Sequence, residues 1–252
     1  MLHVPQRSIL PAPRLWIPPE RPLLAAAPSW YIAGNERGRG AAIIGGGGAA
    51  PAWTATANPA IVNNGFGTST TTFTNQAIGT ASADRIVVVF GSSTFNPTTG
   101  VTCGGNAMTL AVQSDPAGTQ DASVWYLNVT TGTTATIVVE GGIQFVGITV
   151  GILTGVTATP TTTAIDPSES GGDPYTTTTA LTVPSTGFGL VVLGSNSTAV
   201  PFTWNVGTRD FSTTSAGMSI ETGFISASGS QTPSISGPGF ASTYIAAATW
   251  GP

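Results

Sequence analysis

The sequence carries little charge, and this deficit excludes several kinds of protein. Only 7% of its 252 residues are charged, whereas an average soluble domain has about 25%, and lysine is absent. Hydrophobic residues still make up 40% of the chain, which is enough to form a core. A chain of this composition is neither a disordered polyelectrolyte nor a typical basic nucleic-acid binder.

Histidine and cysteine each occur once, as His3 and Cys103. A structural zinc site needs about four nitrogen or sulfur ligands, and Ser-His-Asp or Cys-His catalysis would require His3 as its base. Because His3 lies in a proline-rich stretch away from any expected cleft, we expect no enzyme activity, metal site or other cofactor. Cys103 has no partner for an intrachain disulfide and is expected to be a small buried side chain.

No segment has the composition of a membrane span or of a secretory signal. The longest apolar runs are shorter than the roughly 18 residues that a transmembrane helix needs. Six prolines between residues 5 and 22 also interrupt the apolar stretch that a signal peptide requires. We therefore expect no association with a membrane.

Charge and proline divide the chain into two parts. Residues 1–53 hold five arginines against Glu20 and Glu36, a formal charge of +3, together with eight of the 19 prolines. Residues 54–252 hold two arginines against nine acidic residues, a formal charge of −7. This division predicts an N-terminal arm over residues 1–53, with a glycine-rich hinge at 45–48, and a folded domain over residues 54–252.

The arm is expected to be extended, because its prolines exclude a continuing helix and favour polyproline-like conformations. Large apolar side chains lie between the prolines, and an extended segment cannot bury them on itself. We predict that they bury against the β-domain of the same chain or against another subunit. The arginines would pair with acidic neighbours or with the acidic domain of a second copy. The residues expected to anchor the arm are Arg7, Arg14, Leu15, Trp16, Ile17, Arg21, Trp30, Tyr31, Arg37 and Arg39.

Residues 54–252 have the pattern of an all-β domain. Runs of β-branched and aromatic residues, as at 86–90, 123–129 and 187–193, are separated by turn signals about every 8–12 residues. No window combines helical periodicity with helix caps. The pattern predicts an antiparallel β-sandwich or jelly-roll-like domain of roughly ten to twelve strands.

The order of features over residues 83–157 resembles a known family. The features are, in chain order, Ala83-Asp84-Arg85 before the strand at 86–90, a hairpin at Gly104-Gly105, the strand with Trp125-Tyr126-Leu127, and a Gly155-Val156 turn. This series is similar to a β-sandwich domain common in tailed-phage virion proteins and some bacterial surface proteins, with Cys103 replacing the usual aromatic residue. The resemblance implies the fold and no catalytic residues. Trp125 and Tyr126 should point to opposite faces, one into the core and the other to solvent, the arm or a neighbour.

These patterns predict a non-enzymatic structural protein on the surface of a phage particle. The arm would bind other virion proteins, namely capsid, portal, neck or tail subunits. The β-domain would decorate the surface, as a head decoration protein or a head or neck fibre, with a tail component as the nearest alternative. We also expect homo-oligomerisation, because low charge weakens repulsion between copies, and we expect no nucleic acid as partner, because the arginines are not clustered.

A carbohydrate-binding adhesion module is the alternative function. It predicts a solvent-facing aromatic pair or a calcium site in a loop. Tyr175 and Trp204 are the candidates for stacking on a host-surface glycan, with core or interface packing as the competing interpretation. Asp166, Glu169 and Asp173 are candidate calcium ligands, with a plain acidic loop as the competing interpretation. A hydrolase with paired carboxylates is a third alternative, although most acidic residues lie in apparent turns, where they cap the chain.

Overall fold

The computed structural model describes residues 50–252 except 67–68, 143, 167–173, 197–201, 216 and 238–241. These residues form 19 β-strands and no helix, and every strand pair is antiparallel. The predicted all-β antiparallel fold is therefore confirmed. Within the described ranges, no helix long and apolar enough to cross a membrane occurs.

The first nine strands form a jelly-roll-like half. One sheet has the strand order β1-β9-β3-β7-β6 and the other the order β2-β8-β4-β5, so that the chain passes repeatedly between two sheets. The strands are β1 (Ala52–Asn63), β2 (Thr70–Ala77), β3 (Ile86–Thr94), β4 (Thr98–Cys103), β5 (Asn106–Ala107), β6 (Thr109–Gln113), β7 (Gln120–Asn128), β8 (Thr134–Gly141) and β9 (Phe145–Thr154).

The remaining ten strands form a second half with a related topology. Its five-stranded sheet has the order β10-β19-β13-β16-β15, and two small sheets, β11-β18-β14 and β12-β17, lie opposite. In the first half β1 pairs with β9, and β9 pairs with β3. In the same way, β10 pairs with β19 in the second half, and β19 pairs with β13. The strands are β10 (Thr162–Asp166), β11 (Tyr175–Thr176), β12 (Leu181–Val183), β13 (Phe188–Ser195), β14 (Thr203–Trp204), β15 (Thr208–Ser215), β16 (Met218–Ile225), β17 (Gly229–Gln231), β18 (Ser234–Ser236) and β19 (Thr243–Trp250).

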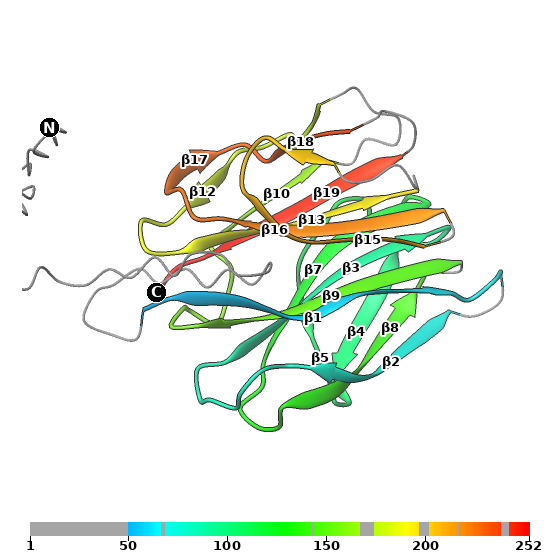
Figure 1. Cartoon of the computed structure of the whole chain (residues 1–252), viewed down its shortest axis with the longest axis horizontal. Helices are drawn as coiled ribbons and strands as arrows, with labels where there is room; N and C mark the ends of the chain where they lie inside the picture. The colour runs from blue at the N-terminus through cyan, green and yellow to red at the C-terminus, as the bar shows by residue number, and fades with distance from the viewer. Residues whose placement is uncertain are drawn as a thin grey trace, which may run out of the picture. The chain divides into compact units, whose positions relative to one another are not determined.

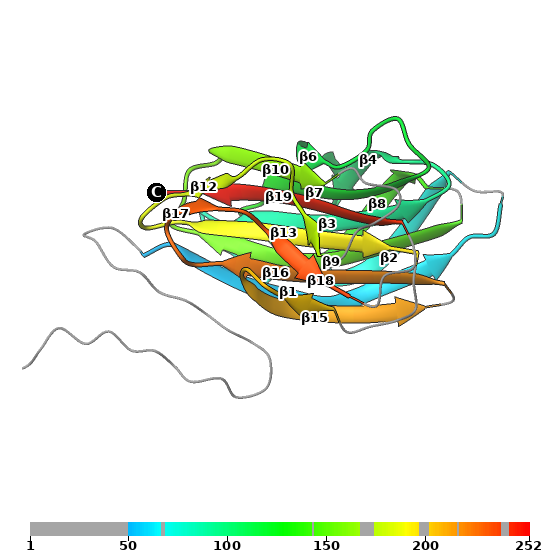
Figure 2. The same cartoon turned by 90° about the horizontal axis from the view of Figure 1, so that it is seen from above.

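The two halves pack through their five-stranded sheets, which gives four layers of sheet (Figure 1). Seen from above, the long strands of the two central layers run in broadly the same direction, which is the aligned mode of sheet packing (Figure 2). Both halves lie within one compact unit of the chain. The 19 strands exceed the expected ten to twelve, and five of them are the strands of only two or three residues in the outer layer of the second half.

The core between the halves explains why several strands are apolar on both faces. All nine residues of β3 are buried, as are all eight of β13 and of β19. One face of β3 packs on the second half and the other on the outer sheet of its own half, so period-two alternation is lost. Tyr126 is half-buried and packs edge-on against Trp250 of the second half, at 6.0 Å between ring centroids. Trp125 anchors the core of the first half, as expected for one of the pair.

The folded part begins before the expected boundary. β1 starts at Ala52, and Trp53 is only 1% exposed, within the core between the two halves. Residue 53 thus belongs to the folded part, and the boundary drawn after it falls inside the first strand. The indole ring, which the sequence groups with the arm tryptophans, instead serves to join the two halves.

Candidate functional site

Asp84 and Arg85, which stand at the start of β3, form a structural clamp. Arg85 is fully buried, and its guanidinium donates to four backbone carbonyls, those of Gly79 (2.8 Å), Val129 (2.6 Å), Thr131 (2.6 Å) and Gly132 (2.9 Å). A hydrogen bond from the Ser82 hydroxyl lowers the pKa of Asp84, and the Asp84 carboxylate also accepts from the N–H of Gly155 at 3.1 Å. The pair thus fixes three loops around the start of the strand.

Asp121 in β7 is buried within the first half. One carboxylate oxygen accepts from the Ser93 hydroxyl, and the other accepts from Nε2 of Gln113 at 2.7 Å. Burial raises the pKa of Asp121, and these hydrogen bonds act in the opposite direction. Because Asp121 is 0% exposed, its carboxyl group contributes to the polar network of the core and does not face a substrate.

Glu221 in β16 is the corresponding buried acid of the second half. It forms an ion pair with Arg209 at 3.6 Å. It also accepts hydrogen bonds from the N–H of Phe202 (3.1 Å), the hydroxyl of Ser212 (2.7 Å) and the indole N–H of Trp204 (2.8 Å). Both carboxylate oxygens are therefore occupied by neighbours from the same half.

The two aromatic residues predicted as glycan-stacking candidates serve the core of the second half. Tyr175 is 2% exposed and meets Phe202 edge-on at 6.4 Å, so core packing is the correct interpretation and the ring cannot stack on a ligand at the surface. Trp204 is partly buried against the same core, and its N–H is held by Glu221. Neither ring forms the solvent-facing pair that the glycan alternative requires.

Several predicted residues lie outside the described part of the chain. They comprise Glu169 and Asp173 of the calcium hypothesis and the arm residues Arg7, Arg14, Leu15, Trp16, Ile17, Arg21, Trp30, Tyr31, Arg37 and Arg39. Asp166, at the end of β10, is described and is 3% exposed. Among the described residues, no group of three or more His, Cys, Asp or Glu side chains is placed to hold a metal ion. Cys103 is free and buried, as expected, and burial raises the pKa of its thiol.

A different aromatic pair is exposed at one end of the first half. Phe66 lies in the β1–β2 connection and is 72% exposed, whereas Phe95 lies in the β3–β4 connection and is 48% exposed. Their rings meet edge-on, at 5.2 Å between centroids and an interplanar angle of 69°. Phe95 also has a φ of 65°, in the left-handed region that residues with a side chain rarely adopt.

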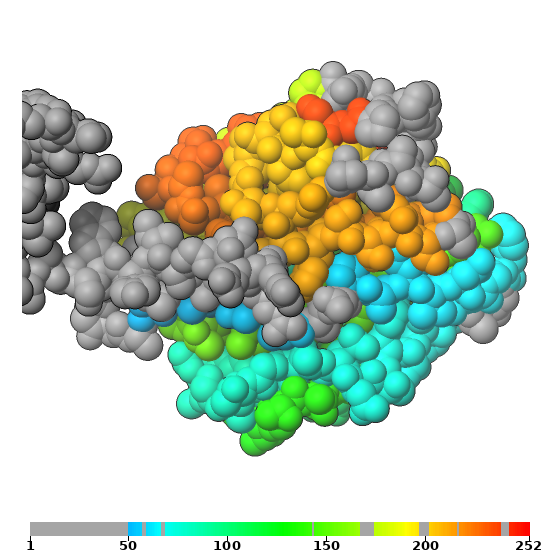
Figure 3. Space-filling view, viewed as in Figure 1, coloured from blue at the N-terminus to red at the C-terminus, as the bar shows by residue number. Residues whose placement is uncertain are grey.

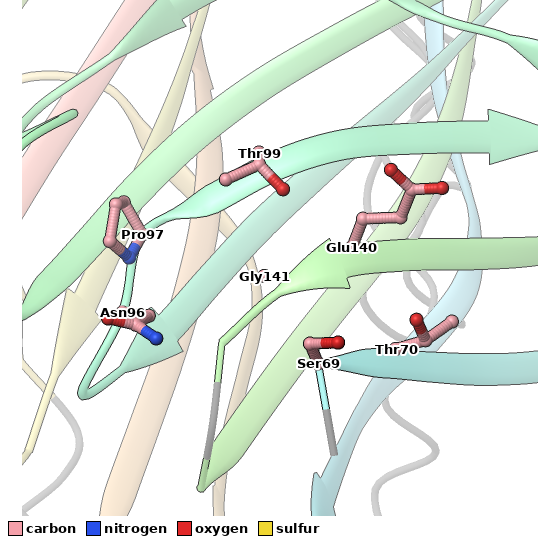
Figure 4. A pocket seen from close by; sticks show the side chains of 7 residues that line it. All are labelled: Ser69, Thr70, Asn96, Pro97, Thr99, Glu140 and Gly141. Atoms are coloured by element: carbon pink, nitrogen blue, oxygen red, sulfur yellow. The ribbon is translucent and has the colours of Figure 1, made fainter.

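Asn96, the residue that follows Phe95, is part of the lining of a shallow pocket of about 460 Å³ (Figure 4). Its lining consists of Ser69, Thr70, Asn96, Pro97, Thr99, Glu140 and Gly141. Glu140 in β8 lies in register between Thr70 of β2 and Gly100 of β4, and its carboxylate stands on the same side as the Thr99 hydroxyl (Figure 4). Hydroxyl, amide and carboxylate groups therefore surround this pocket.

Gly141 lets the pocket walls come close together. Its φ is +83°, and a Cβ at this position would lie 2.2 Å from the carbonyl oxygen of Pro97. The N–H of Gly141 donates to the carbonyl oxygen of Ser69 at 2.8 Å. The end of β8 is thus held between the loop that carries Phe95 and the start of β2, and only glycine fits there without displacing them.

Among the described residues that line it, the pocket lacks the paired carboxylates of the hydrolase alternative. Glu140 is its one ionisable lining residue, whereas hydrolysis of a glycoside by carboxylates requires two acidic groups. The sequence did contain a signal for the aromatic pair, because Phe66 follows Gly65 and Phe95 precedes Asn96-Pro97. A large apolar residue inside a turn sequence is exposed more often than one inside a strand.

Comparison with protein-family models, curated proteins and solved structures finds no match to this chain.

Proposed function

We propose that this chain is a non-enzymatic structural protein on the surface of a phage particle, anchored to other virion proteins by residues N-terminal to β1. The absence of enzyme activity in this proposal is supported by the hydrogen bonds of the buried ionisable groups, which bind neighbouring protein groups. Arg85 binds four backbone carbonyls, and Asp121 accepts from two side chains. Glu221 accepts three hydrogen bonds and forms an ion pair with Arg209. These groups stabilise a rigid scaffold.

The location on a particle is supported by the sequence. Residues 83–157 resemble the virion β-sandwich domain, and the clamp role of Asp84 and Arg85 gives that shared pattern a structural meaning. The N-terminal segment combines basic and large apolar residues, which suits burial against acidic partner subunits. Capsid, portal, neck or tail subunits are the proposed partners, and a head decoration or a head or neck fibre is the proposed role. The low surface charge also favours association between copies of the chain.

Binding to particles lacking this protein tests the proposal. The full chain is compared with a chain lacking residues 2–49, which retains Ala52 and Trp53 and therefore every described strand. Co-sedimentation should recover the full chain in a fixed ratio to the capsid protein, whereas the shortened chain should stay in the supernatant. Equal recovery of the two chains, with identical melting curves, would overturn the anchoring role of the arm.

A point variant of the full chain avoids the deletion. Trp16→Ala combined with Trp30→Ala removes two large apolar groups from the arm. Leu110→Ala, which shortens a 39% exposed side chain of β6, is the matched control. We expect the double variant to reduce recovery on particles at least tenfold and the control to leave it unchanged. If the double variant sediments like the control, apolar anchoring by the arm is wrong.

A further inference from the structure

At one end of the first half, the exposed aromatic pair and the polar pocket involve neighbouring residues of the chain. Phe95 belongs to the exposed aromatic pair with Phe66, and the next residue, Asn96, already lines the pocket that contains Glu140. We infer that the aromatic pair and the pocket together form a binding site for an uncharged carbohydrate. This site goes beyond the proposed structural role and does not depend on it, because all of its residues lie in the folded part.

The aromatic pair lowers the stability of the fold, because it exposes apolar surface and requires a strained backbone at Phe95. Phe66 and Phe95 are two of the three large hydrophobic side chains exposed among the described residues, and they contact each other. Phe95 also occupies a left-handed backbone conformation, which glycine or asparagine would adopt with less strain. Exposed apolar surface and strained backbone at the same residue are typical of a binding loop.

The pocket supplies the polar groups that a sugar requires. A sugar ring has apolar C–H faces and a rim of hydroxyl groups, so its binding sites combine an aromatic surface with hydrogen-bonding side chains. Here the hydroxyls of Ser69, Thr70 and Thr99 and the amide of Asn96 can donate or accept, and the carboxylate of Glu140 accepts from sugar hydroxyls. A volume of about 460 Å³ falls within the range of small-ligand pockets, about 300–1,000 Å³.

Charge determines which class of sugar fits. Glu140 is the one ionisable group in the lining, and a Cβ on Gly100 would lie 3.1 Å from its Oε2, so the carboxylate lies over the strands at the pocket wall. Residues 54–252 carry a formal charge of −7, from two arginines and nine acidic residues. The site therefore repels uronic and sialic acids and favours neutral hexoses or N-acetylhexosamines.

The test uses the full chain on an array of immobilised oligosaccharides. The array contains neutral hexose, N-acetylhexosamine, uronic-acid and sialic-acid members, and the strongest neutral binder is then titrated calorimetrically. We expect binding to neutral members only. Phe66→Ala and Phe95→Asn should each weaken binding at least tenfold, and Asn tolerates the left-handed backbone at residue 95. Glu140→Gln should weaken binding severalfold, because an amide accepts fewer hydrogen bonds than a carboxylate.

Leu110→Ala is the matched control, because Leu110 is an exposed apolar residue outside the pocket lining. A blank array, binding confined to acidic sugars, or equal affinity of Phe66→Ala and Leu110→Ala would each overturn the inference. Loss of particle association in Phe66→Ala, together with a blank array, would assign the pair to a protein contact instead. The chain lacking residues 2–49 should keep its sugar affinity, which separates a failure of this site from a failure of the arm.

Discussion

Trp53 and Asp210 connect the two halves of the fold by a hydrogen bond between residues 157 positions apart. The indole N–H of Trp53 in β1 donates to Oδ2 of Asp210 in β15 at 2.8 Å, and the Trp53 ring meets Phe90 edge-on at 5.6 Å. Strands β1 and β15 lie against each other on the face drawn in Figure 3. Burial raises the pKa of Asp210 to about 7, and the hydrogen bond from Trp53 opposes this rise.

Asp210 should make the stability of the fold depend on pH. Because its pKa is higher in the folded chain than the ordinary value of 3.8, the folded state holds the proton more tightly than the unfolded state. This contribution is fully present below the ordinary value and is lost as the pH rises through about 7. We expect the free energy of unfolding to fall by on the order of 2 kcal/mol between pH 5 and pH 8 from this group.

Urea unfolding of the natural chain and of Asp210→Asn at both pH values measures this effect. The asparagine oxygen can still accept from Trp53 but carries no proton that titrates. The variant should therefore show a smaller loss of stability toward pH 8. Identical pH profiles of the two chains would mean that Asp210 keeps an ordinary pKa in the fold.

Local patterns predicted the strands, whereas the contacts between the halves needed the structure. The β-branched run at 86–90 predicts β3, and the Gly104-Gly105 pair predicts the hairpin after β4, because both signals are local. The strands β11 and β14 have two residues each, too few for a periodic pattern. The sequence therefore did not predict the second jelly-roll-like half as a separate part of the fold.

The candidate site was predicted less well than the fold. Tyr175, a candidate for glycan stacking with core packing as the alternative, pairs with Ile235 in a small sheet that covers the core of the second half. Phe66 and Phe95 come together from two different loops, and the sequence separation of 29 positions carries no periodic signal. The bond between Trp53 and Asp210 was hidden for the same reason, because it depends on the packing of complete sheets.

Arg85 should be hard to replace, even by lysine. Its planar guanidinium serves four carbonyls of the Gly79 and Val129–Gly132 segments at once, whereas an ammonium group has three donors and a different geometry. Arg85→Lys should lower the free energy of unfolding by about 3 kcal/mol, because buried carbonyls lose their donors. Arg209→Lys, at a side chain that is 37% exposed, should cost less than about 1 kcal/mol in the same urea titration. Equal losses in the two variants would contradict the clamp.

Glu221 should be essential to the second half. Glu221→Ala removes the acceptor for Phe202, Ser212 and Trp204 and should cost about 3 kcal/mol, because buried donors are left without a partner. Glu221→Gln keeps one acceptor oxygen and should cost less. Glu140→Gln, at an exposed position of β8, is the control and should change stability by less than about 0.5 kcal/mol. Thermal unfolding monitored by circular dichroism gives all three values, and a Glu221→Ala chain as stable as the control would contradict the network.

Gly151 should be intolerant of a methyl group because the Trp53 ring fills the space above it. A Cβ on Gly151 would lie 2.1 Å from the Trp53 ring, and that ring is fixed by its contact with Phe90 and its bond to Asp210. Gly151→Ala should therefore cost about 2 kcal/mol. Gly147→Ala on the same strand is the control, because its Cβ would meet the flexible end of Met218 at 3.2 Å, and a smaller loss is expected.

A double-mutant cycle shows whether the Trp53 ring is the cause of that loss. Trp53→Phe provides a smaller ring, so adding Gly151→Ala to this variant should cost less than adding it to the natural chain. The coupling between the two sites should be at least about 1 kcal/mol, measured by urea unfolding at pH 5, where Asp210 is mostly protonated. Additive losses would instead show that the cost of Gly151→Ala does not come from the Trp53 ring.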